Sequence, residues 1–131
     1  MISLDLARAL LHQSGVLWEP NAGDRFVIEA ELLTSEVFWV SNLTIEPQHF
    51  ADQTVLGFNG TTEWALDSIS LDQAVWLPRE DQLRELLGDR LESLHRVTDG
   101  WEVTYAVSDG TRHTLTDPDV ECAYARALLT L

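Results

Sequence analysis

Residues 57–88 read GFNGTTEWALDSISLDQAVWLPREDQLRELLG, and the expected fold is built outward from this stretch. Its first part predicts a hairpin, because Asn59 and Gly60 tolerate positive φ and lie between two runs of strand-forming residues. A two-residue turn at this pair would place Leu56 opposite Glu63. It would therefore decide which side chains share a face of the hairpin.

The second part of the stretch predicts a strand followed by a helix. Residues 74–77 form a short apolar run, and Pro78 suits the first position of a helix, where its missing N–H is not needed. Glu80 and Arg84 have the i,i+4 spacing of a helical ion pair, and Gly88 is typical of the position just past a helix end. A central helix is therefore expected to begin at Pro78 and to end before Gly88.

Helices are also expected at both ends of the chain. Ser3 is a good N-cap for an amphipathic helix that ends before Gly15. Near the C-terminus, Asp117 is expected as the N-cap and Pro118 as the first residue of a helix with a continuous apolar face. This last helix should close the core.

Short runs of β-branched and aromatic residues predict strands in the first half of the chain. Residues 26–28 and 37–40 are two such runs, and the continuous apolar character of the second indicates a central strand covered on both faces. A further short strand is expected over residues 43–46, ending at Pro47, with a loop from there to residue 53.

The second half of the chain contains the clearest strand pattern. Large side chains alternate with polar or small ones from residue 101 to residue 107. The Asp-Gly pairs at positions 99–100 and 109–110 predict tight turns on either side of this run. A three-stranded antiparallel meander with one exposed face is therefore expected.

Together these elements predict an α+β fold, with a mainly antiparallel sheet of short strands and hairpins and with N-terminal, central and C-terminal helices. The regular alternation of strand and helix that builds parallel sheets is missing. A chain of 131 residues is long enough to bury a core, so residues 1–131 are expected to form a single globular α+β domain.

The charge of the chain limits its partners. The net charge is −14, with eight arginines and no lysine. Such a field repels phosphates and anionic lipids, so neither nucleic acid nor a membrane surface is expected as a partner, whereas a basic or apolar protein is. The absence of lysine also excludes a Schiff-base lysine and a Walker A loop. Oligomeric state is not predicted.

No motif indicates a cofactor or a metal. The four histidines lie far apart in the sequence, and the glycines form no dinucleotide-binding pattern. Cys122 is the single cysteine, which favours a reducing compartment and a packing role. The N-terminal segment carries charges within its apolar stretch and no apolar run is long enough to span a bilayer, so a cytoplasmic location is expected.

Glu63 is the strongest candidate for a functional side chain. If Leu56 and Phe58 shared its face, they would partly desolvate it, and it could act as a general base or hold a cationic group, with Asp67 on the same face. The alternative is that a helix covers the two apolar residues while Glu63 forms a structural ion pair with an arginine. Two tryptophans could line a groove beside this face, and these are Trp39 and Trp76.

Three phrases of the sequence resemble a known family. WEPNAGDRF (residues 18–26), FNGTTEWALDS (residues 58–68) and WLPREDQLRELLG (residues 76–88) look like a family of small acidic bacterial proteins of uncharacterised function, found mainly in actinobacteria-like, GC-rich genomes. Members are sometimes labelled pilus assembly proteins, a label usually reserved for a partitioning-type ATPase. Because this chain has no Walker A loop, the resemblance implies no activity, and it provides no catalytic residues.

These observations favour a non-enzymatic interaction or regulatory module that uses its acidic surface against a basic or apolar partner. The alternative is a small-molecule binder or hydrolase with a pocket around Glu63 and Trp64. A third interpretation is mimicry of nucleic acid by rows of carboxylates.

Overall fold

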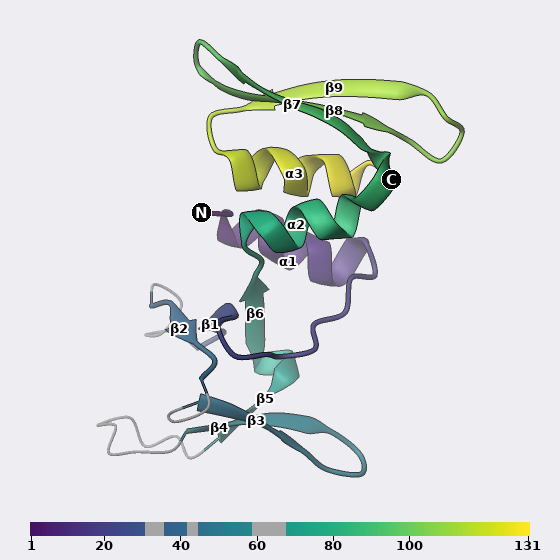
Figure 1. Cartoon of the computed structure of the whole chain (residues 1–131). Coiled ribbons are helices and arrows are strands. Elements are labelled where there is room, and N and C mark those ends of the chain that lie inside the picture. Colours follow the sequence, from purple (N-terminus) through teal and green to yellow (C-terminus); the bar gives the residue numbers. More distant parts are fainter. Residues whose placement is uncertain (31–35, 42–44, 59–67) are drawn as a thin grey trace. The chain divides into compact units, whose positions relative to one another are not determined.

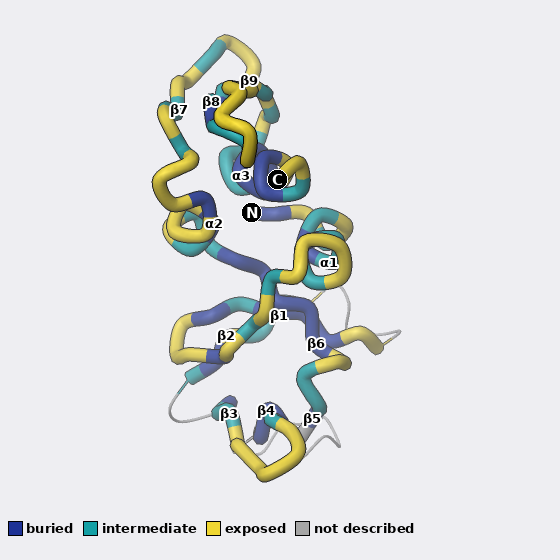
Figure 2. The backbone as a smooth tube through the Cα atoms, turned by 90° about the vertical axis from the view of Figure 1, so that its right-hand side faces the viewer, coloured by how far each residue is buried: buried dark blue, intermediate teal, exposed yellow. Residues whose placement is uncertain are grey.

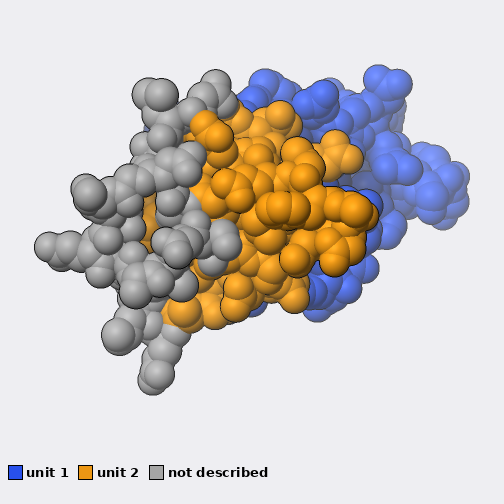
Figure 3. Space-filling view, turned by 90° about the horizontal axis from the view of Figure 1, so that it is seen from below, with its two compact units in different colours: residues 1–17, 77–131 blue, residues 18–76 orange. Residues whose placement is uncertain are grey.

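The computed structural model describes residues 1–30, 36–41, 45–58 and 68–131. Within these residues there are three α-helices and three small antiparallel sheets, which confirms the predicted α+β fold. The chain divides into two compact units, shown in different colours in Figure 3. Unit 1 comprises residues 1–17 and 77–131, and unit 2 is the continuous segment 18–76 inserted between them. The single domain expected from the chain length stays a prediction.

Unit 1 is a meander packed against helices. Its strands are β7 (Leu91–Val97), β8 (Gly100–Ala106) and β9 (Arg112–Asp117), in the order β7-β8-β9. One face of this sheet packs on α3 (Val120–Leu129), as Figure 1 shows, and α3 in turn contacts α1 (Leu4–Gln13) and α2 (Glu80–Leu87). A short 3-10 helix, η2 (Gly88–Arg90), joins α2 to β7.

The sequence pattern of the meander is realised in the register of its strands. Leu94, Val103 and Leu115 are paired across the sheet, and Val103 and Tyr105 are buried against the helices. On the opposite face, Thr104 and Thr114 bring their hydroxyl oxygens to 3.0 Å from each other. The predicted three-stranded meander with one polar face is therefore confirmed.

The first residues of two helices differ from the prediction. Helix α2 begins at Glu80, because Gln82 Oε1 accepts a 3.0 Å hydrogen bond from the Arg79 N–H and so makes Arg79 the N-cap. Pro78 lies one residue before that cap. At the N-terminus the prediction is confirmed, since the Ser3 hydroxyl accepts from the Leu6 N–H.

Helix α3 is capped by Asp119 and not by Asp117. Asp119 Oδ1 accepts a 3.0 Å hydrogen bond from the Cys122 N–H. Asp117 ends β9, where its carboxylate accepts hydrogen bonds from the Asp119 N–H at 2.9 Å and from Arg126 Nε at 2.7 Å. Asp119 is therefore the N-cap of α3, because Asp117 belongs to the end of β9.

The helices of unit 1 are joined by side chains of α3. Glu121 accepts hydrogen bonds from two separate backbone segments, from the Ile2 N–H at 2.9 Å and from the Glu80 N–H at 3.2 Å. Tyr124 donates its hydroxyl hydrogen to Glu80 Oε1 at 3.1 Å, and Arg84 also contacts Glu80, at 3.6 Å. The predicted Glu80–Arg84 pair is thus confirmed as one part of a larger network.

This network predicts a shifted titration of Tyr124. Burial, together with the Glu80 carboxylate, raises its pKa to about 12. The folded protein therefore keeps the phenol protonated, and the stability that this contributes is complete below about pH 10 and lost as the pH rises toward about 12. In the Tyr105→Phe variant, where Tyr124 is the remaining tyrosine, absorbance should detect little phenolate at about pH 11. A folded-state midpoint equal to that of the urea-unfolded chain would contradict this contact.

The described part of unit 2 consists of two three-stranded sheets around a common core. The first sheet has the strand order β2 (Phe38–Trp39), β1 (Arg25–Ile28), β6 (Ala74–Leu77). The last residue of β6 belongs to unit 1. The second sheet has the strand order β3 (Ile45–His49), β4 (Thr54–Phe58), β5 (Ser68–Ser70). The 3-10 helix η1 (Leu71–Gln73) links β5 to β6. The core residues are Phe26, Ile28, Val40, Ile45, Leu56, Ile69 and Ala74. Figure 2 shows the buried backbone of β1 and β6 in dark blue.

Two predictions for the strands of unit 2 are wrong. Residues 37–40 were expected to form a central strand, but β2 is only two residues long and lies at the edge of its described sheet, with 52% of Trp39 exposed. Strand β3 does not end at Pro47 but continues to His49. Proline is tolerated there because β3 is an edge strand of its described sheet.

The register predicted from the Asn59-Gly60 pair is also wrong. Strand β4 pairs with β5, so that Leu56 lies opposite Ile69 instead of Glu63. This register places the side chains of both Leu56 and Ile69 in the core of unit 2. The Asn59-Gly60 turn itself lies outside the described residues.

Candidate functional site

Two adjoining cavities in unit 2 form the candidate ligand site in the described part of the chain. The first has a volume of about 330 Å³ and is lined by Trp18, Glu19, Pro20, Asn21, His49, Thr54 and Leu71. The second, of about 340 Å³, is lined by Gln53, Thr54, Ser70, Leu71 and Asp72. Because the two share Thr54 and Leu71, they form one depression, named here the Trp18 furrow.

The aromatic wall of the furrow is firmly held. The ring of Trp18 stacks on that of Trp76, with 6.4 Å between centroids and 5° between planes, and lies 5.6 Å from the ring of Phe26. Its Nε1 donates to Asp24 Oδ2 at 2.9 Å, and the Asn21 N–H donates to the same oxygen at 3.0 Å. The loop after Trp18 is therefore fixed by a buried carboxylate, and the wall is preorganised.

The other walls of the furrow carry polar groups. His49 and Thr54 are cross-strand partners at the end of the β3–β4 hairpin, with 3.1 Å between His49 Nδ1 and Thr54 Oγ1. Ser70 donates its hydroxyl hydrogen to Asp72 Oδ1. The side-chain carboxylate of Glu19 makes no hydrogen bond or ion pair within the residues that the structure describes. The furrow therefore presents exposed carboxylate oxygens beside an aromatic wall.

The negative charge of the protein is concentrated in the same unit. The sequence of residues 18–76 holds ten Asp and Glu residues against one arginine, a net charge of −9 of the total −14. That arginine, Arg25, lies with its guanidinium carbon 6.0 Å from the ring centroid of the exposed Trp39. The field around the furrow therefore favours cations.

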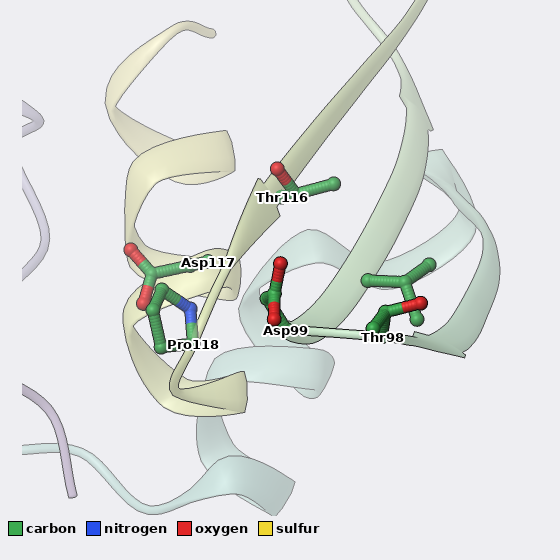
Figure 4. A pocket seen from close by; sticks show the side chains of 6 residues that line it. Thr98, Asp99, Thr116, Asp117 and Pro118 are labelled. Carbon is green, nitrogen blue, oxygen red and sulfur yellow. The ribbon is translucent and has the colours of Figure 1, made fainter.

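A further hollow lies in unit 1, at the turn between β7 and β8, and is shown in Figure 4. It has a volume of about 340 Å³ and is lined by Val97, Thr98, Asp99, Thr116, Asp117 and Pro118. Both carboxylate oxygens of Asp117 already accept hydrogen bonds, from Asp119 and Arg126. Their role is to fix the passage from β9 to α3, so the furrow in unit 2 is the better candidate.

Four of the residues singled out in the sequence lie in the described part of the chain, at different places in unit 2. Leu56 is fully buried in the core of unit 2, and the backbone of Phe58 ends β4. Trp39 is exposed at an edge strand, whereas Trp76 is 7% exposed and supports Trp18 from behind the furrow. The other three residues of the predicted site lie outside the described residues, and these are Glu63, Trp64 and Asp67.

Other chemistries find little support in the described residues. No group of three or more His, Cys, Asp or Glu side chains there is placed to hold a metal ion. Burial raises the pKa of the Cys122 thiol, which makes its thiolate less accessible at neutral pH. None of the helices in the described segments has the length and apolar character that crossing a bilayer requires.

No protein-family model, curated protein or solved structure matches this chain. The resemblance to a family of small acidic bacterial proteins stays a prediction. Any functional interpretation therefore rests on the geometry and charge of the described residues.

Most residues of the furrow were missed by the sequence analysis. The sequence patterns assigned no functional role to Trp18, Glu19, His49 or Asp72. A turn-rich loop that begins with a tryptophan and contains a buried aspartate is the signal that could have indicated a fixed aromatic wall. Nothing in the spacing indicates that residues 19, 49 and 72 approach one depression.

Proposed function

We propose that this protein is a non-enzymatic binding module that receives a cationic, extended segment of a partner protein in the Trp18 furrow. The observation that carries the proposal is the coincidence of a preorganised aromatic furrow with the unit that holds most of the negative charge. Long-range attraction would bring a basic segment to unit 2, and the furrow would give it a defined place.

The side chains of arginine and lysine suit this furrow. Each has an aliphatic stem that can lie along Trp18, Pro20 and Leu71, and a cationic head that can reach Glu19 or Asp72. Acceptor oxygens in the furrow can take hydrogen bonds from the head group. An anionic or purely apolar segment would desolvate these carboxylates without neutralising their charge, which costs free energy.

Neutralising the furrow should weaken binding more than the same change elsewhere. We expect the double variant Glu19→Gln, Asp72→Asn to bind a dibasic peptide about 2- to 30-fold more weakly in calorimetric titration, because exposed ion pairs contribute about 0.2–1 kcal/mol each. Affinity for the unchanged protein should fall as salt is added.

The matched control removes two exposed carboxylates from unit 1 with the same change in net charge, in the double variant Glu85→Gln, Asp89→Asn. This control should bind almost as well as the unchanged protein. If both double variants bound the peptide equally weakly, net charge alone would explain the effect. That result would refute the furrow as the binding site.

A further inference from the structure

We infer that the Trp18 furrow recognises two cationic side chains at alternate positions of one extended segment, in the order cation, any residue, cation. This inference rests on the proposed function and specifies its ligand. It concerns the arrangement of the two cavities, because a single acidic surface would accept basic residues at any spacing.

The two cavities are chemically similar and adjoin each other. Each carries one carboxylate side chain, Glu19 in the first and Asp72 in the second. Thr54 and Leu71 line both cavities and so lie where the two meet. The furrow therefore has two places for a cation, separated by a hydroxyl and an apolar side chain.

An extended peptide can present two side chains to two adjoining places. Alternate side chains of such a chain point to the same side, about 6.5–7 Å apart, while immediate neighbours point to opposite sides. Two arginines separated by one residue can therefore both enter the furrow. Two consecutive arginines can place only one side chain in it.

The side chains of the segment, and not its backbone, should provide the recognition. Strand β3, whose His49 lines the furrow, is the outer strand of its described sheet, and Pro47 stands in the middle of that strand. Proline has no N–H to offer to an added strand. Pairing of the segment with this edge is therefore disfavoured. The spacing of its cationic side chains then becomes the main determinant of its affinity for the furrow.

Two peptides of equal composition test this inference. Each has blocked ends and two arginines within an otherwise alanine and glycine sequence, spaced as Arg-Ala-Arg in one and as Arg-Arg-Ala in the other. Calorimetric titration of the protein should give an affinity about 3- to 10-fold higher for the first, since only that peptide forms the second ion pair together with its apolar contacts. In the Glu19→Gln and Asp72→Asn single variants the ratio of the two peptide affinities should fall toward one.

The outcomes separate this inference from the proposed function. Equal affinity for both peptides, with weakening in the Glu19→Gln, Asp72→Asn double variant, would overturn the spacing rule and leave the furrow as a binding site for basic segments. Binding of neither peptide would overturn both proposals. Spermidine that binds as tightly as the Arg-Ala-Arg peptide would overturn the extended segment as the ligand, because two linked ammonium groups would then suffice.

Discussion

Replacement of Gly100 by alanine is expected to destabilise the protein by about 2–5 kcal/mol, one of the two largest effects that the structure predicts. Gly100 begins β8 with φ of 151°, a conformation that L side chains rarely adopt. A Cβ at this position would overlap the carbonyl oxygen of Asp117 and would lie 2.6 Å from Cα of Pro118. Because both of those atoms belong to the backbone at the end of β9 and directly after it, neither can move aside without shifting the strand or the start of α3.

Gly110 is the matched control for this substitution. It also has positive φ, at 85°, but no heavy atom lies within 4 Å of its Cβ position. The Gly110→Ala variant should therefore lose only the stability that positive φ costs an L residue, about 1–2 kcal/mol. Urea denaturation of both variants measures the difference directly. Equal destabilisation of the two would contradict the close approach of the β7–β8 turn to the start of α3.

The Phe26→Ala variant should lose about 3–5 kcal/mol of stability. Phe26 is fully buried in the core of unit 2, and its ring lies 5.6 Å from that of Trp18 and 5.7 Å from that of Phe38. Its removal would leave a cavity behind the aromatic wall of the furrow, so binding of the Arg-Ala-Arg peptide should weaken together with stability.

Phe50 provides the control for this second prediction. It lies at the tip of the β3–β4 hairpin and is 58% exposed, so the Phe50→Ala variant should change stability by no more than about 0.5 kcal/mol. Denaturation curves of the two variants would test this contrast. A comparable loss in both would show that the core of unit 2 is not organised around Phe26.

The meander could be predicted because its signals are local. Both Asp-Gly pairs lie at turns, although the first turn is made by Thr98 and Asp99, with Gly100 already paired to Val97. The alternation between the pairs leaves one register that buries both Val103 and Tyr105. The helices follow from similar short-range patterns. Their first residues were less accurately predicted, because the choice between Asp117 and Asp119 depends on contacts with Arg126, which lies two turns further along the chain.

The register predicted from Asn59-Gly60 differs from the observed one because the pairing of β4 depends on what the core buries. The observed register of β4 with β5 buries Leu56 and Ile69 together, and this gain depends on the other sheet of unit 2. The furrow could not be predicted from the sequence because it also depends on contacts between distant segments. Its walls come from residues 18–21, 49–54 and 70–72, which only the completed sheets bring together.

The most direct test of the central claim is to map where a dibasic peptide binds. Backbone amide shifts of the ¹⁵N-labelled protein, followed during titration with the Arg-Ala-Arg peptide, should change most at Glu19, Thr54, Leu71 and Asp72. Peptide binding with the largest changes in the meander of residues 91–117 would contradict the assignment of the furrow, and the absence of any change at high peptide concentration would contradict recognition of basic segments altogether.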